Sequence, residues 1–139
     1  MLLCTFVAFS TTAQDKSSQR RQWMNEMKKA KVEFMIQELD ITSEQKEKFV
    51  ELYNAFENEL HKLRHDTRAL EKSVSSKKEA SDLELTKVSE AMFEFKSKEG
   101  EIINRYYDKF KQILTPRQLF EFQKAEAKWM KQLMKHRKK

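Results

Sequence analysis

The chain has 139 residues, with 28 Lys and Arg against 22 Asp and Glu, and it contains one Gly, one Pro and one Cys. A single Gly excludes the glycine-rich phosphate loops of nucleotide-binding domains, and a single Cys excludes a disulfide scaffold or a Cys-x-x-Cys metal site. So few turn-forming residues cannot connect the many short strands of a β-sandwich or barrel. We therefore predict one all-α domain.

The N-terminal segment is apolar from Leu2 to Phe9 and then changes to small and polar residues up to Gln14. This pattern is typical of a secretory signal peptide cleaved after Ala13, although no Lys or Arg precedes the apolar run. The run is too short to span a bilayer, which takes about 20 apolar residues. The alternative is an apolar N-terminus on a protein that is not exported. We expect residues 1–13 to be a signal peptide and residues 14–139 to be one exported domain without Cys, because Cys4 lies in the leader.

Three polar breaks divide the exported part into four predicted helices. The first helix covers 17–38, with a basic flank, and the third covers 81–113, with Gly100 inside it. The fourth begins at Pro116 and gives way to the basic tail 135–139. The second helix has apolar residues at a heptad-like spacing, which predicts one buried seam. The residues of that seam are Phe49, Leu52, Phe56, Leu60, Leu63, Thr67, Leu70 and Val74.

The second and fourth predicted helices start with the same short sequence. In each, a Thr (Thr42, Thr115) stands three residues before a Gln (Gln45, Gln118). This spacing predicts a capping box, in which the two side chains satisfy amide groups that a helix start leaves free. Pro116 suits the first helical position because that residue needs no N–H partner.

These two segments, Ile41-Thr42-Ser43-Glu44-Gln45 and Leu114-Thr115-Pro116-Arg117-Gln118, resemble the LTxxQ motif of the Spy/CpxP family, with Ile41 as a conservative departure from Leu. Members of that family are small exported all-helical proteins of the Gram-negative periplasm. The resemblance implies an elongated, hairpin-like four-helix protomer that forms a cradle-shaped homodimer, with the two Thr and two Gln as structural caps. It also implies an ATP-independent chaperone that binds unfolded or partly folded envelope proteins. Docking on an envelope-stress sensor kinase and zinc binding in stress resistance are the alternatives.

Apolar residues outside the helical stripes, together with nearby basic residues, are the candidate client-binding side chains. Met adapts its shape to varied partners, and basic residues attract acidic unfolded chains over long range. The candidates are Arg20, Arg21, Trp23, Met24, Met27, Lys28, Lys31, Phe93 and Phe120. The alternative, that these residues fill the core or a dimer interface, stays open.

Other functions have weaker support in the sequence. His61 and His65 share one helix face and form half of a zinc site, but a helix alone supplies no further ligand, so we expect neither a metal nor another cofactor. The net charge of +6 would suit nucleic acid, but the charges are interspersed and no nucleic-acid motif occurs, so we expect no such partner. The basic tail is better suited to weak contact with an anionic membrane surface. No spacing pairs a nucleophile with a base, so we do not expect an enzyme.

Overall fold

A computed structural model describes the backbone of residues 11–137 and the side chains of residues 14–137. Its helices are α1 (Thr11–Glu38), α2 (Ser43–Ser75), α3 (Asp82–Phe110) and α4 (Pro116–Arg137). The described part contains no strand, so the prediction of an all-α fold is confirmed. The predicted signal peptide lies, up to residue 10, outside the described residues. Among the helices described, none is both long enough and apolar enough to cross a membrane.

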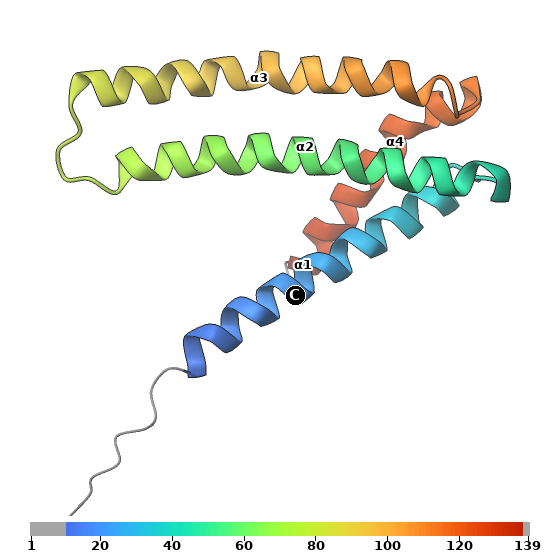
Figure 1. Cartoon of the computed structure of the whole chain (residues 1–139), viewed down its shortest axis with the longest axis horizontal. Helices are drawn as coiled ribbons and strands as arrows, with labels where there is room; N and C mark the ends of the chain where they lie inside the picture. The colour runs from blue at the N-terminus through green and yellow to red at the C-terminus, as the bar shows by residue number, and fades with distance from the viewer. Residues whose placement is uncertain (1–10, 138–139) are drawn as a thin grey trace, which may run out of the picture.

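The four helices form two antiparallel pairs that diverge from a common end (Figure 1). Helices α2 and α3 make one long pair, the hairpin, and helices α1 and α4 make the other, the arm. Within the arm, the Phe34 and Trp129 rings lie 5.3 Å apart and Lys128 Nζ lies 2.6 Å from Glu38 Oε1. This is the elongated four-helix protomer that the resemblance implies, and its outline is a V.

Both Thr-x-x-Gln motifs cap a helix at the junction of the arm and the hairpin. The Gln45 amide N–H donates to Thr42 Oγ1 at 3.3 Å, and the Thr42 N–H donates to Gln45 Oε1 at 3.1 Å. The second motif repeats this arrangement, with 3.2 Å from Gln118 N–H to Thr115 Oγ1 and 2.9 Å from Thr115 N–H to Gln118 Oε1. Each capping box satisfies two amide groups at the start of α2 or α4.

The two Gln side chains also bind each other, although they are 73 residues apart in the sequence. Each Nε2 donates to the other residue's Oε1 at 2.8 Å. The remaining Gln45 N–H donates to the Ile113 carbonyl at 2.9 Å, and Gln118 Nε2 also reaches the Leu39 and Asp40 carbonyls at 3.2 and 3.3 Å. The amide pair therefore joins the turn after α1 to the turn after α3, with every donor and acceptor of both side chains used.

The turn after α1 is set by a left-handed residue. Asp40 has φ of 49°, its N–H donates to the Gln37 carbonyl at 3.3 Å, and the Ile41 N–H donates to the Ile36 carbonyl at 3.0 Å. These two bonds define a Schellman motif, which usually places Gly at the left-handed position. Ile36 and Ile41 both pack against the core and supply the apolar contact that accompanies this motif.

The core lies at the junction, where all four helices contribute. Met35, Phe49 and Tyr53 are its largest fully buried side chains, and the Phe110 and Phe122 rings lie 5.0 Å apart. Centroid distances of 4.5–7 Å are the favourable range for aromatic pairs. The buried cluster comprises Val32, Met35, Leu39, Phe49, Tyr53, Phe56, Leu60, Tyr106, Phe110, Leu114, Phe122 and Ala125.

The predicted seam of α2 is only partly buried, and this is a correction. Leu70 is 40% exposed, and Met92 of the facing α3 stripe is 47% exposed, because the far half of the hairpin has no third helix to cover it. Val88 is the one buried apolar residue in the described part of that far half. Conversely, Tyr53 is absent from the predicted seam but fully buried, because the arm covers a second face of α2 near the junction.

Helix ends also differ from those predicted. The first helix begins at Thr11 rather than Ser17, because no Gly or Pro interrupts the intervening residues. The third ends at Phe110, so Ile113 lies in the turn. The fourth continues through the first part of the basic tail to Arg137. Basic side chains at a helix C-terminus interact favourably with the helix dipole, which explains this extension.

Candidate functional site

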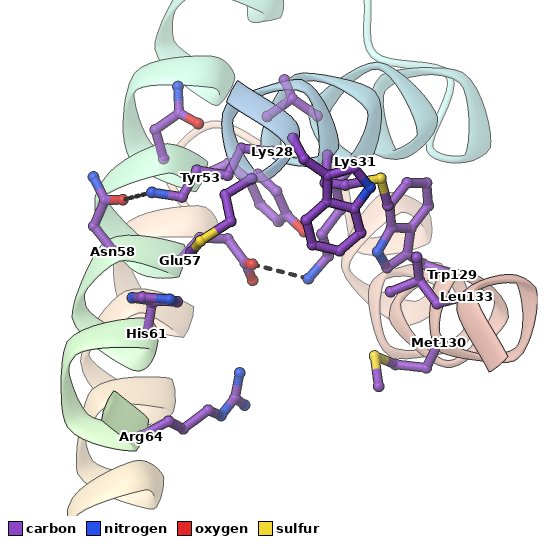
Figure 2. A pocket seen from close by; sticks show the side chains of 15 residues that line it. Lys28, Lys31, Tyr53, Glu57, Asn58, His61, Arg64, Trp129, Met130 and Leu133 are labelled. Atoms are coloured by element: carbon purple, nitrogen blue, oxygen red, sulfur yellow. Dashed lines mark hydrogen bonds and ion pairs between the residues drawn. The ribbon is translucent and has the colours of Figure 1, made fainter. Parts of the chain in front are cut away.

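A groove of about 280 Å³ lies where the arm diverges from α2 (Figure 2). Three helices line it, and most of its surface is apolar. From α1 it takes Trp23, Met24, Met27, Lys28, Lys31 and Val32, from α2 Tyr53, Asn54, Glu57, Asn58, His61 and Arg64, and from α4 Trp129, Met130 and Leu133. We call this surface the groove. It exists because the arm leaves the hairpin at an angle, so the facing sides of α1, α2 and α4 separate with distance from the junction.

A hydrogen-bonded ion pair network forms the deep end of the groove. Lys31 Nζ lies 3.0 Å from Glu57 Oε2 and 2.8 Å from Glu126 Oε2, and its side chain is only 14% exposed. The Tyr53 hydroxyl donates to Glu126 Oε1 at 2.6 Å. The network links one residue of α1, two of α2 and one of α4, and it fixes the angle at which these helices meet. Breaking such a shielded pair leaves an uncompensated charge, which is costly.

The protonation of this network is set by burial. Burial raises the pKa of Tyr53, and the negative charges of Glu126 and Glu57 raise it further. Tyr53 therefore stays neutral and remains a hydrogen-bond donor at physiological pH. Within the described residues, no buried side-chain nitrogen or oxygen is left without a hydrogen-bond partner. The deep end is thus a satisfied structural network.

The outer part of the groove is apolar and accessible. Trp23 is 60% exposed and Met130 is 53% exposed, whereas Met24 and Met27 are half-buried behind them. Trp129 is half-buried because its ring packs against that of Phe34, tilted by 49°. Thioether and indole groups contact varied apolar partners with little shape specificity, since Met has three rotatable bonds. The outer groove is therefore suited to apolar segments of different sequence.

The charged side chains along the groove are largely held in hydrogen bonds or ion pairs. Lys28 Nζ donates to Asn58 Oδ1 at 3.2 Å, and Arg64 lies 3.2 Å from Glu99 Oε2. Lys31 already faces two carboxylates. The groove itself thus offers apolar contact more than net charge.

The structure brings together five of the nine predicted client-binding residues and separates the other four. Trp23, Met24, Met27, Lys28 and Lys31 line the groove. Arg20 and Arg21 are exposed on α1 but do not line it, Phe93 lies on α3 with 84% exposure, and Phe120 lies on α4 under Lys124, whose Nζ is 4.3 Å from the ring centroid. Trp129, Met130 and Leu133 also line the groove but are not among the predicted client-binding residues, because they continue the apolar stripe of α4 and such a stripe usually indicates packing. Nothing in the sequence distinguishes them from the buried part of that stripe, which in the structure ends at Ala125.

The two histidines lie on one face of α2. Their rings are 6.3 Å apart and nearly parallel, and His61 lines the groove while His65 Nδ1 lies 3.4 Å from Asp66 Oδ1. Across residues 14–137 no group of three His, Cys, Asp or Glu side chains is placed to hold a metal ion. A zinc site normally takes at least three protein ligands. In the described part, the zinc alternative therefore has two ligands at most.

Both Thr-x-x-Gln motifs and the helices that they cap lie within a segment that matches a known family. The family model described as LTXXQ motif family protein matches residues 27–128, which include both motifs, the C-terminal part of α1, more than half of α4, and the whole hairpin. The chain belongs to the LTXXQ motif family. Proteins of this family are generally periplasmic, and membership indicates a stress protein of the Spy/CpxP kind. Searches of curated proteins and of solved structures gave no match.

Proposed function

We propose that this LTXXQ protein is an exported, periplasmic, ATP-independent chaperone that binds unfolded or partly folded proteins in the groove and suppresses their aggregation. The observation that carries the proposal is the open groove between α1, α2 and α4, whose outer surface consists of accessible Met and Trp side chains. The function is binding without catalysis, since a chaperone of this kind needs a surface rather than a reactive group.

The groove suits weak and varied contact. Burying apolar surface contributes about 25 cal/mol per Å², so a client segment that covers a few Met and Trp side chains gains several kcal/mol before its ordering cost. The contact needs no fixed sequence because Met repacks around different shapes. The satisfied network at the deep end, Lys31 with Glu57 and Glu126, limits how far a segment can enter and keeps the binding at the surface.

The test measures aggregation of two unrelated, chemically denatured proteins by light scattering, without nucleotide. The purified protein is expected to suppress scattering at a near-stoichiometric ratio. A Met27→Gln/Met130→Gln variant, which keeps the side-chain length but makes the groove polar, is expected to need several-fold more protein for the same suppression. Unchanged scattering with the wild-type protein would overturn the chaperone function.

A matched control tests whether suppression of aggregation depends on the groove or on exposed apolar side chains anywhere on the surface. Leu83→Gln/Phe120→Gln removes two residues that are 65% and 63% exposed and lie outside the groove. This variant should suppress aggregation like the wild type. Equal loss in both variants would contradict the groove as the client site. A specific pull-down of one sensor kinase, without suppression, would favour the regulatory alternative.

We infer also that the protein is a homodimer and that α3 carries the contact. Phe93 is 84% exposed, and Leu85 and Met92 beside it are about half exposed. Gly100 lies two turns further along α3, and a Cβ added there would meet nothing within 4 Å. If the second copy packs antiparallel with the two-fold axis between residues 96 and 97 of α3, Phe93 of one protomer lies over Gly100 of the partner subunit. Sedimentation equilibrium should then give a dimer for wild type, a monomer for Phe93→Asn, and an unchanged dimer for Phe120→Asn.

A further inference from the structure

The charge of the chain is unevenly distributed along the V. Residues 14–31 carry six Lys and Arg against two acidic residues, and residues 127–139 carry six against none. Residues 41–115, which form most of the hairpin, carry 14 against 15 and are nearly neutral. The two basic stretches include the halves of α1 and α4 that lie away from the junction (Figure 1). The net charge of +6 therefore comes from the free end of the arm.

Apart from Lys31 and Lys128, which pair with carboxylates, the described cations at this end are exposed and have no ion-pair partner in the described part of the chain. These are eight side chains with no carboxylate oxygen within 4.0 Å among the described residues, namely Lys16, Arg20, Arg21, Lys28, Lys29, Lys131, Lys135 and Arg137. In the hairpin, by contrast, Arg64 pairs with Glu99 and Arg105 forms two hydrogen bonds with Glu59. Unpaired surface cations of one sign produce a positive potential that attracts an anionic surface.

Three apolar side chains are exposed at the same end of the arm. Trp23, Met130 and Met134 are 60%, 53% and 60% exposed. Trp23 of α1 and Met130 of α4 line the same groove, so the two helices present them together. A surface that combines exposed Trp and apolar residues with Lys and Arg is typical of helices that lie in the interface of an anionic bilayer. The indole ring suits this interface because one edge is polar and the rest is apolar.

We propose that the free end of the arm docks on the surface of an anionic phospholipid bilayer. The exposed, unpaired cations of this end contact the headgroup phosphates, and Trp23, Met130 and Met134 enter the interface. Nucleic acid offers the same phosphates but no apolar layer, and it would leave these three side chains without a partner. The docking does not rest on the proposed function, but Trp23 and Met130 belong to both surfaces, so a bound bilayer and a bound client compete for these two side chains.

The test uses the full chain with vesicles of phosphatidylglycerol and phosphatidylcholine, or of phosphatidylcholine alone, and no client. Co-sedimentation is expected with the anionic vesicles and should weaken as salt rises, since exposed charges are screened. In a Trp129→Phe background Trp23 is the one remaining Trp, and its emission should shift to the blue on binding. The apolar stretch 2–9 is common to all variants, so it cancels from the comparison between them.

The decisive variant is Arg20→Gln/Arg21→Gln/Lys131→Gln/Lys135→Gln. Each cation near an anionic leaflet strengthens association roughly fivefold, so this variant should bind at least about 100-fold more weakly at low salt. The control Lys46→Gln/Lys48→Gln/Lys72→Gln/Lys78→Gln removes the same charge from exposed hairpin positions and should change binding less than about fivefold. Equal loss in both variants, binding without a blue shift, or equally tight binding to a DNA oligonucleotide would each overturn the proposal.

Discussion

Replacing Gln118 by Ala removes the side chain that joins the arm to the hairpin. Gln118 is 7% exposed, and its amide accepts from Thr115 N–H at 2.9 Å and exchanges two bonds of 2.8 Å with Gln45. It also donates to the Leu39 carbonyl at 3.2 Å. A buried polar group left without its partner costs about 1–3 kcal/mol. The substitution leaves the Thr115 N–H, the Gln45 amide and the Leu39 carbonyl without this partner. Because Gln45 is half-buried and water can reach part of it, we expect the combined loss to be about 3 kcal/mol rather than the full sum for these groups.

That loss is a large part of the 5–15 kcal/mol that stabilises a typical domain. Urea unfolding followed by circular dichroism at 222 nm measures it, with Gln132→Ala, exposed on the same helix, as a control that should stay within about 0.5 kcal/mol. Gln45→Ala should cost about 2 kcal/mol, and the double variant should cost less than the sum by about 1–2 kcal/mol. A Gln118→Ala loss as small as that of the control, or strict additivity with Gln45→Ala, would refute the joined-motif reasoning.

Three further changes test other parts of the fold. Asp40→Gly relieves a left-handed residue and should raise the free energy of unfolding by up to about 1 kcal/mol, measured in urea. Tyr53→Phe removes the hydrogen bond to Glu126 and should cost about 1–3 kcal/mol, whereas Tyr107→Phe, half exposed and in no such bond, should cost little. The pKa of Glu59 is lowered by hydrogen bonds from Arg105 and Tyr106. Its contribution is therefore present above the unfolded-state pKa near 4.5 and lost as pH falls through the lower folded-state pKa, so Glu59→Gln should flatten the acid side of a melting-temperature profile.

Capping and side-chain spacing predicted the helices well, because the residues that start a helix lie within a few positions of one another. The Thr42 and Thr115 caps each depend on residues three apart, and the single Pro stands at the first position of α4, where its missing N–H costs nothing. The same rules gave the two motifs but not their contact. Nothing in either segment shows that Gln45 and Gln118 form an amide pair, because that pairing depends on how the turns after α1 and α3 come together.

The candidate site was predicted in part for the same reason. Trp23 and Met27 stand out in the sequence because they lie among basic residues, and both line the groove. Met130 follows the apolar stripe of α4 and looked like core, yet it is 53% exposed because the arm leaves the hairpin before that turn. Phe93 looked equivalent to Trp23 but lies on another surface. Which apolar residues share a surface depends on the angle between helix pairs, and helical periodicity does not encode it.

By itself, the sequence determined the helical class, the starts of α2 and α4, and membership of a family marked by two Thr-x-x-Gln segments. These follow from composition, capping and side-chain spacing, all of which act within a few residues. Only the tertiary structure decided that the two motifs bind each other, that the far half of the hairpin is uncovered, and that α1, α2 and α4 enclose a groove above the Lys31 network. The physical reason is that the angle between the arm and the hairpin is set by contacts between residues dozens of positions apart, such as Tyr53 with Glu126.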